Sequence, residues 1–494
     1  MREKACVNGN FRHAELHLSL GLFCVAASVT VSSRGQEFAP SGSDPLRVDP
    51  QVLHQGVRLP GDSQAPGCTE SLSRDQPLDL ERAASFALCN SPKARATWEA
   101  IEVQAGVLGE AKAAYLPSVV SSLTVQRERN LFPGESALDD SKTGHSAYVN
   151  GSWRVFDFGG RAANRESAEH LLSAALATHD AKLQEILDAV IAAYFDAVTA
   201  KAELEASQRT RSLASDTFAA TGRREGKGAA SHNDTLQAQV ALEKSLLAEK
   251  KAFGTYSRDL AVLGYTMGLT PNATFSLPSL ENPPLGTIGE LNQWLEVAEA
   301  QHPALVAARE EWAAMTRKVT ATRSEGRPTL DFTANLFVNG YPNQGFQTTP
   351  TRQTTFGLTV TVPLFEGFAR AYKVQEAVAQ ARGAEAQYKD REYQVLMVVV
   401  KAHADAVSAL GNLDSSEALL SAGRAAEESS ERRYASGATS ILELLTSQSN
   451  LADAEQQRVQ CLSEWYAARL RLWTSAGTLG LTRLKHPLIP PEVK

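Results

Sequence analysis

Residues 353–362, QTTFGLTVTV, alternate strictly between apolar and small polar side chains. The apolar positions are Phe356, Leu358, Val360 and Val362, and the residues between them are Thr355, Gly357, Thr359 and Thr361. Successive side chains of a β-strand point to opposite faces, so this segment predicts a strand with one apolar and one polar face. A length of about ten residues matches the span of a tilted membrane strand.

Three further segments show the same alternation. Residues 329–338 carry apolar side chains at Leu330, Phe332, Ala334 and Leu336. A less regular pair lies earlier in the chain, with Val119, Ser121, Leu123 and Val125 in one segment and Val149, Gly151, Trp153 and Val155 in the other. Each pair is joined by a polar loop, NLFPGESALDDSKTG or NGYPNQGFQTTPTRQ. The four segments therefore predict two β-hairpins, whose long polar loops suit the outer side of a membrane.

Two such hairpins could also pack on helices in water, and the hairpins alone do not separate these alternatives. The neighbouring segments favour the membrane. Residues 160–222 and 367–435 are rich in Ala, Glu, Leu and Gln, which lose little side-chain freedom in a helix. A helix of roughly 60 residues spans roughly 90 Å. Such a rod must pack laterally against other rods, because one globular core cannot cover it.

The chain repeats one plan twice. Pro117 in AYLPSVVSS corresponds to Pro328 in EGRPTLDFT at an offset of 211 residues, and Phe156 corresponds to Phe365 at an offset of 209. Two further landmark pairs keep these offsets, namely Pro92 with Pro303 and Gly228 with Gly437. Four landmarks in register indicate a tandem duplication.

Each repeat contains a helical stretch, two alternating segments, a very long helix and, after a Gly-containing turn, a further helix. The first helical stretches are 79–114 and 289–325, and the last helices are 230–268 and 439–476. We therefore divide this part of the chain into a first repeat (78–270), a linker (271–288), a second repeat (289–480) and a C-terminal tail (481–494). The linker contains four prolines and is not expected to be helical.

Four strands cannot close a barrel, since the smallest membrane barrels have about eight. Open strand edges are not viable in lipid, so closure requires several copies of the chain. Three copies would supply twelve strands and leave room for a lumen. If the strands span a membrane, trimerisation therefore follows from geometry.

Bulk properties exclude several other classes. A formal net charge of -7 argues against a nucleic-acid partner. Beyond the N-terminus we find no run of 18 or more apolar residues, so no transmembrane helix is expected. The ten histidines are scattered without metal-ligand spacing, and the segment from Gly226 to Ser231 lacks the ending of a phosphate loop. We expect no enzyme, metal or cofactor. A purely structural coiled-coil surface protein would explain the rods but not the hairpins.

The N-terminal region is typical of an exported protein. Residues 1–35 resemble a signal peptide, with basic residues before an apolar core, and residues 36–77 are rich in Pro, Gly, Ser and Asp and predict an extended arm. Cys68 and Cys89 flank a short segment before the first strong helix. In an oxidising compartment we expect them to form a disulfide, and two unpaired thiols are the alternative.

These landmarks resemble the TolC-type outer-membrane factors across nearly all of residues 78–480. The resemblance rests on the duplicated plan, on Leu116–Pro117, on FDFGGR at 156–161 and above all on YASGATSILELLTSQ at 434–448. It implies a mainly α fold with a membrane β-barrel, that is, a homotrimeric twelve-stranded barrel in the outer membrane continued by a long α-helical periplasmic tunnel. The linker and both chain ends would then form a belt around the middle of the tunnel.

The resemblance also implies functional positions at the far end of the tunnel. Asp234 and Tyr434 match positions that hold the mouth shut, and Glu443 matches an acidic ring that favours cations. The turns for adaptor docking would lie at Gly226, Gly228, Ser231, Gly437 and Ser440. Ordinary solvated helix N-termini are the alternative for Asp234 and Glu443, because an acid there complements the helix dipole.

Two residues depart from the family pattern at this mouth. Thr439 replaces a basic latch residue, and Thr446 replaces a second acidic ring. We therefore expect a different or weaker latch, with Arg432 or Arg433 as substitutes.

The implied partners are an inner-membrane transporter, a periplasmic adaptor protein, outer-membrane lipid and the exported cargo. Type I secretion of a protein and efflux of drugs or metals use the same kind of duct. The segment LCNSPKARATWEAIEVQAG resembles family members that export a toxin, and no lipidation box surrounds Cys24. Both features favour secretion, with efflux as the alternative.

Overall fold

The computed structural model describes residues 76–130, 140–270, 273–279, 288–339 and 351–481, together with positions 46, 48, 59, 131, 133, 134 and 484. The chain divides into two compact units, Met1–Pro45 and Leu46–Lys494. The first unit, which includes the predicted signal, lies outside the described residues. Most of the predicted arm and of the C-terminal tail lies outside them as well.

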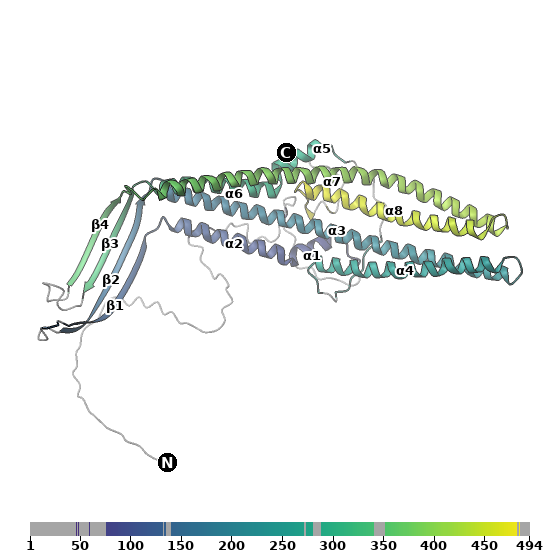
Figure 1. The fold of residues 1–494 in the computed structure, drawn as a ribbon, viewed down its shortest axis with the longest axis horizontal. Helices are drawn as coiled ribbons and strands as arrows, with labels where there is room; N and C mark the ends of the chain where they lie inside the picture. The colour runs from purple at the N-terminus through teal and green to yellow at the C-terminus, as the bar shows by residue number, and fades with distance from the viewer. Residues whose placement is uncertain are drawn as a thin grey trace, which may run out of the picture. The chain divides into compact units, whose positions relative to one another are not determined.

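The described residues show the same succession of elements in both halves (Figure 1). The first half contains α1 (Leu80–Asn90), α2 (Pro92–Ala113), β1 (Ser118–Asn130), β2 (Asp140–Phe156), α3 (Gly160–Glu225) and α4 (His232–Thr266). The second contains α5 (Leu291–Gln301), α6 (Pro303–Ser324), β3 (Thr329–Asn339), β4 (Thr351–Thr361), α7 (Ala369–Ala435) and α8 (Ile441–Ser475). The alternating segments are thus strands, and the long runs are helices of 66 and 67 residues.

One prediction is wrong in both halves, because each first helical stretch is interrupted. Residues 79–114 form α1 and α2 with a break at Ser91, and residues 289–325 form α5 and α6 with a break at His302. Both break residues are extended, with ψ of 119° and 121°. The cause is the proline that follows each of them. Proline disfavours helical geometry in the residue before it but is tolerated at the first position of a new helix.

The strands form one antiparallel sheet in the order β1-β2-β3-β4. The two hairpins have the same register once the duplication offsets are applied. Ser118 pairs with Ser152 in the first hairpin, and Thr329 pairs with Thr361 in the second. The first partners differ by 211 residues and the second partners by 209. The outer edges of β1 and β4 have no neighbouring strand among the described residues.

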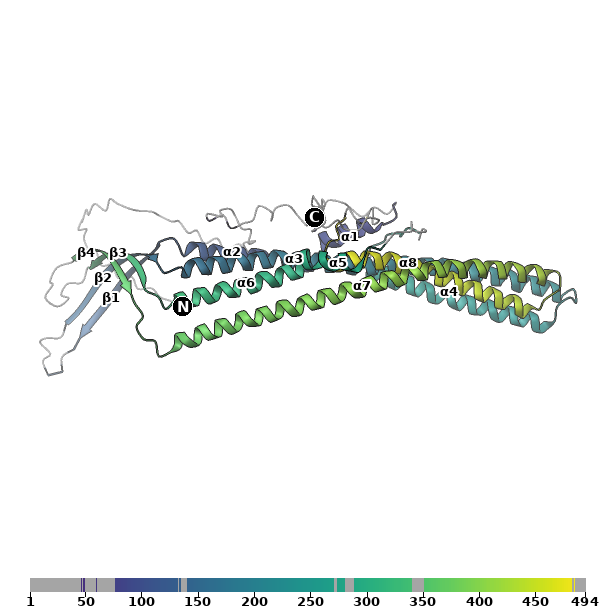
Figure 2. The same ribbon diagram turned by 90° about the horizontal axis from the view of Figure 1, so that it is seen from above.

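The helices form a wall of four rods that continues the sheet. α3 packs against α2 and α4 on one side and against α6 and α8 on the other, and α7 packs against α6 and α8. Figure 2 shows α2 and α6 near the sheet and α4 and α8 at the other end. The rod order is therefore α2 with α4, then α3, then α6 with α8, then α7. This is the order of the attached strands, so within the described part of the chain the same two edges are open throughout.

Two glycines make the composite rods possible. Gly268 follows α4 and lies beside Asn90, just before α2 begins, and Gly477 follows α8 where that helix meets α6. Both have positive φ, of 70° and 74°. A side chain at Gly268 would also lie 2.9 Å from the carbonyl oxygen of Asn90. These left-handed helix ends let one helix stop and the next begin in nearly the same line.

The main apolar core surrounds these joints. It combines buried residues of α1, α3, α5, α7 and α8, among them the fully buried Trp465 and the edge-to-face pair Trp294 and Trp473. A smaller cluster joins α2 to α3. The middle of the rods is thus the best-packed part, and the sheet and the turns lie at its two ends.

α7 is more apolar than the sequence analysis expects. It contains an 18-residue window with a mean hydropathy of 1.2 and at most two charged residues, of which only 22% is buried. By length and composition alone, this helix could cross a membrane, whereas the sequence predicts no such helix. The prediction considered only unbroken apolar runs and therefore missed an apolar helix that contains isolated charges.

Candidate functional site: a two-faced sheet and the helical tips

The register of the sheet sorts its side chains onto an apolar and a polar face. Leu123 pairs with Ala147, which pairs with Val338, so these residues share one face with Trp153 and Phe332. The other apolar residues of this face are exposed in the single chain, notably Val119, Val125, Phe356, Leu358 and Val360. An exposed apolar face of this extent suits lipid rather than water.

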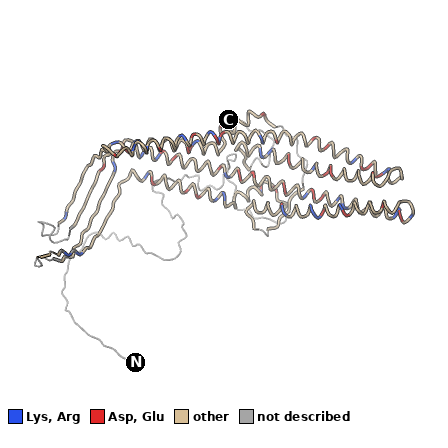
Figure 3. The backbone as a smooth tube through the Cα atoms, viewed as in Figure 1, with Lys and Arg blue, Asp and Glu red and all other residues tan. Residues whose placement is uncertain are grey.

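The opposite face carries hydrogen-bonded polar side chains. Tyr148 Oη donates to Asn335 Oδ1 at 2.9 Å, and the side chain of Asn150 donates to the same oxygen. Near the helices, Arg154 Nε lies 2.9 Å from Asp331 Oδ1. Thr and Ser side chains fill about half of the remaining positions. Such a surface can line a water-filled lumen, and Figure 3 shows few charges along the strands.

A clamp at the strand-to-helix elbow holds the sheet to the rods. Asp157 Oδ2 accepts from the backbone N–H of Arg161 at 2.8 Å and from its Nε at 3.2 Å. Arg161 Nη1 also donates to the carbonyl oxygen of Arg154 at 2.7 Å. The second repeat has the corresponding ion pair between Glu366 and Arg370. Sequence reasoning missed this clamp, although an acid four residues before an arginine recurs in both repeats.

The elbow also holds two aromatic residues in an uncommon backbone conformation. Phe158 and Phe368 are the described non-glycine residues with positive φ, at 53° and 64°. Each lies at the N-terminus of a long helix, beside Gly159 or Gly367, whose φ is also positive. Such strain persists only where surrounding contacts hold it, here the Asp157–Arg161 and Glu366–Arg370 clamps.

At the opposite end, two short turns join α3 to α4 and α7 to α8. Gly228 and Gly437 have φ of 71° and 77°, which confirms the predicted reversal at these residues. Gly226 caps α3 in a right-handed conformation. Ser231 and Ser440 cap the next helices and accept from the backbone N–H groups of residues 234 and 443. The structure therefore has turns at both predicted positions, while the role of these turns in adaptor docking stays a prediction.

Tyr434 links the helix pair α7–α8 to the helix pair α3–α4. Its partner in this contact, Arg224, was not indicated by the sequence. The guanidinium of Arg224 lies 4.8 Å from the centre of the Tyr434 ring, and its Nη1 donates to the Tyr434 carbonyl oxygen at 2.9 Å. The Tyr434 hydroxyl lies 3.4 Å from Thr221 Oγ1. This contact ties α3 to α7 directly above the turns.

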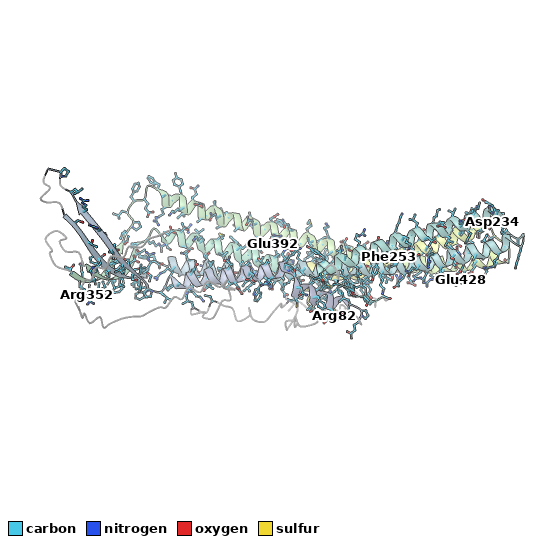
Figure 4. The ribbon with its side chains drawn as sticks, turned by 90° about the horizontal axis from the view of Figure 1, so that it is seen from below. Arg82, Asp234, Phe253, Arg352, Glu392 and Glu428 are labelled. Atoms are coloured by element: carbon cyan, nitrogen blue, oxygen red, sulfur yellow. The ribbon has the colours of Figure 1, made fainter. Side chains whose placement is uncertain are left out.

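Asp234 and Glu443 form local contacts at their helix starts. Asp234 accepts from the Ser231 backbone N–H at 3.0 Å in a capping box, and no described contact joins it to Tyr434. Glu443 lies 2.9 Å from Arg433 Nη1 and also accepts from Thr439. Arg432 instead pairs with Glu428 at 3.6 Å. Figure 4 shows Asp234 at the tip end and Arg352 at the sheet end. Within one chain, Asp234 therefore acts as a helix cap, whereas Glu443 bonds to the side chains before its helix, which Ser440 caps.

A buried polar layer lies about two to three helical turns from the tip. Gln448 Nε2 donates to Thr217 Oγ1 at 3.1 Å, and the Glu427 side chain bonds to Gln448. Glu427 is only 8% exposed. Burial raises the pKa of the Glu427 carboxyl, nearby Glu431 raises it further, and the Gln448 bond opposes the shift. The sequence missed this layer because its residues are ordinary polar helix residues.

Cys89 is disulfide-bonded. Its predicted partner Cys68 lies outside the described residues, so the Cys68–Cys89 pairing stays a prediction. Among the residues that the structure describes, no group of three or more His, Cys, Asp or Glu side chains could hold a metal ion.

Three curated proteins are similar to this chain along much of its length. Protein CyaE of Bordetella pertussis is 33% identical over 414 residues, which cover 84% of this chain and 87% of that protein. Nodulation protein T of Rhizobium leguminosarum is 24% identical, with 74% and 78% covered. The alkaline protease secretion protein AprF of Pseudomonas aeruginosa is 22% identical, with 60% and 62% covered.

Two solved structures show the same fold. The outer-membrane channel OprN gives a TM-score of 0.71 at 19% identity and covers 86% of this chain and 99% of that chain. The outer membrane protein VceC of Vibrio cholerae gives 0.70 at 18% identity and covers 81% and 96%. These identities show likeness of fold alone.

The two-faced sheet and the helical wall thus define an outer-membrane channel protein, a class whose fold is not that of an enzyme. Within this class, the family model for outer membrane efflux proteins matches residues 83–268 and 294–478, which is one match for each repeat. The chain belongs to the outer membrane efflux protein family, which includes the TolC-type channels. It is an outer-membrane component of a tripartite export system.

The buried carboxyl of Glu427 yields a prediction about stability and pH. A raised pKa in the folded state means that the free energy of unfolding falls as pH rises through the window from the ordinary carboxyl pKa to the raised one. Glu427→Gln should therefore raise the midpoint of thermal unfolding at pH 7.5 by about 2 °C, a shift that corresponds to roughly 1 kcal/mol in a large domain. The gain should vanish near pH 4. Circular dichroism melts measure it.

Glu102→Gln is the matched control, because Glu102 is an exposed helical carboxylate. It should leave the midpoint unchanged at both pH values. Equal midpoints for wild type and Glu427→Gln at pH 7.5 would show that Glu427 carries no such penalty.

Proposed function

We propose that three copies of the chain close into a twelve-stranded barrel continued by a helical tunnel, and that this duct exports a protein by type I secretion. The main support is that the strands lie side by side in the same order as the helical rods, and that both layers leave the same two edges open. Unpaired strand edges are not viable in lipid. The β1 edge of one copy can pair with the β4 edge of the next, and the rods below them meet in the same way.

Apolar side chains on the two edge rods support this closure. On α7, Tyr372, Tyr393 and Met397 are exposed, and on α4 Val240 and Phe253 are exposed. Exposed apolar residues in such numbers on a helix mark an interface with another protein surface. The apolar window of α7 is explained in the same way, as a surface that a neighbouring copy covers and not as a membrane span.

The duplication suggests the register between copies. β1 corresponds to β3 and β2 to β4, so the seam between β4 and the neighbouring β1 is the counterpart of the β2–β3 pairing. Within the chain, Gly151 pairs with Ala334 and Val149 with Leu336. Applying the offsets of 209 and 211 places Val360 opposite Leu123 of the neighbouring copy, and Leu358 opposite its Val125. All four side chains then lie on the apolar face.

The tips would bind the adaptor and form the mouth. In the trimer, Asp234, Tyr434 and Glu443 would come close to their counterparts in neighbouring copies and hold the mouth closed. The contacts that each makes within the chain are compatible with this role. Glu443 can leave Arg433 at little cost, because the ion pair is about half exposed and exposed pairs contribute at most about 1 kcal/mol.

Secretion of a protein is favoured by the relative named as an alkaline protease secretion protein, which shares 22% identity with this chain. The alternative is efflux of small molecules, which the family description names. The polar face of the sheet does little to separate protein cargo from small-molecule cargo, since a lumen lined by Thr, Ser and Asn binds no particular chemical group of the cargo strongly. We propose no catalytic role.

Cysteine crosslinking tests the seam. In a Cys461→Ser background, Val360→Cys with Leu123→Cys should give disulfide-linked dimers and trimers when membranes are treated with an oxidant. Val360→Cys with Val119→Cys is the control, because a shift of four residues separates the cysteines by about 13 Å along the strand. Gel electrophoresis without reductant measures the products. Monomers alone, or equal crosslinking of the control, would contradict the register.

The role of Glu443 is tested in planar bilayers. Glu443→Ala should reduce block of the channel by divalent or trivalent cations severalfold, because three carboxylates would be lost from the aperture. Glu376→Ala, which removes an exposed carboxylate from the sheet end of α7, should not change the block. An unaltered block in Glu443→Ala would remove that residue from the aperture.

Deletion of the gene tests the cargo. Under the secretion proposal, one or more proteins should disappear from the culture supernatant and accumulate in cells. The minimum inhibitory concentrations of drugs and metals should stay within about one twofold dilution step of wild type. Mass spectrometry of supernatants and growth-inhibition assays measure the two outcomes. Greater susceptibility with an unchanged secretome would favour efflux instead.

A further inference from the structure

Three arginines lie at the loop end of the apolar face of the sheet. Arg127 pairs with Thr143 and Val125 pairs with His145, so Arg127 and Arg129 continue the apolar side of β1. In the second hairpin, Val338 pairs with Arg352, which continues the apolar side of β4 in the same way. The apolar band therefore ends in arginine on both edge strands.

The part of the chain that the structure describes gives these arginines no acidic partner. The strand positions that share their face carry no Asp or Glu in β1, β2, β3 or β4. Arg127 Nε donates to Ser141 Oγ at 3.3 Å, and no ion pair involves any of the three within the described residues. Arg154 provides the contrast, because it lies on the polar face and pairs with Asp331. Among the described residues, the charge at the end of the apolar band thus has no acidic partner.

The seam brings the arginines of two copies together. This step rests on the proposed trimer and its register. The same offsets that place Val360 opposite Leu123 place Phe356 opposite Arg127 of the neighbouring copy and Arg352 opposite its Leu131. Arg352 then lies diagonal to the neighbouring Arg129, at a Cβ separation of roughly 7–8 Å. Arginine side chains can converge on one anion across that distance.

We propose that Arg127 and Arg129 of one copy and Arg352 of the next form a binding site for the phosphate groups of outer-leaflet glycolipid. The site lies on the lipid face immediately beyond the apolar band, which is the level of lipid headgroups. A guanidinium presents a planar set of donors that matches phosphate. An anionic headgroup would supply a negative charge that the described strand positions on this face do not carry. One such site occurs at each seam.

Lipid binding to the purified protein tests the site. The probe is bisphosphorylated lipid A, added to detergent-solubilised trimer and counted by native mass spectrometry. The variant Arg127→Gln/Arg129→Gln/Arg352→Gln should bind it at least about tenfold more weakly, because several charge-assisted hydrogen bonds are lost at once. Wild-type protein should bind up to one lipid A per seam and should bind dephosphorylated lipid A much less.

The control Arg95→Gln/Arg258→Gln/Arg309→Gln removes the same charge from exposed helical positions and should bind lipid A like wild type. Trimer mass and channel conductance are measured on every sample, so loss of the trimer is distinguished from loss of the site. With trimers intact, unchanged binding by the strand variant would overturn the proposal. Equal binding of dephosphorylated lipid A, or of phosphatidylglycerol, would overturn it as well.

Discussion

The architecture depends on the backbone hydrogen bonds that the four described strands leave unmade at the two edges of their sheet. In water these groups would bind solvent, but in lipid each unpaired group costs several kcal/mol. A sheet with exposed apolar residues on one face and two open edges is therefore incomplete by itself. The rods below the sheet have the same order and the same open edges. One constraint thus governs the membrane part and the helical part together.

The tandem duplication simplifies the proposed closure of the sheet and the rods by neighbouring copies of the chain. Because each repeat contributes one hairpin and two rods, the junction within the chain and the proposed junction between chains would be built from corresponding elements. The agreement of both hairpin registers with the offsets of the duplication shows that the repeats have kept their geometry. The paired elbow clamps at Asp157 and Glu366 show the same. A pseudo-sixfold wall can therefore arise from three identical chains with little adjustment at the seam.

The sequence predicted the elements that have a strong period and missed those that depend on distant contacts. β3 and β4 agree with the alternating segments to within two residues at each end, since a period of two is a direct property of a two-faced strand. The helix breaks at Ser91 and His302 were missed, although the following prolines signal them. Arg224 could not be found, because its stacking partner Tyr434 lies 210 residues away. Glu427 was missed because burial, and not residue type, makes it unusual.

The distribution of contacts along the rods suggests how a rigid duct can have a movable mouth. Large aromatic and aliphatic side chains pack at the middle, where composite rods meet. Towards the tips the packing changes to a cation-π contact at Tyr434, a buried polar layer at Glu427 and helix caps. Each of these interactions contributes about 1 kcal/mol, much less than the burial of a large apolar side chain. Two arrangements of the tip can therefore differ by only a few kcal/mol while the middle stays fixed, and a partner that binds one arrangement better can select it.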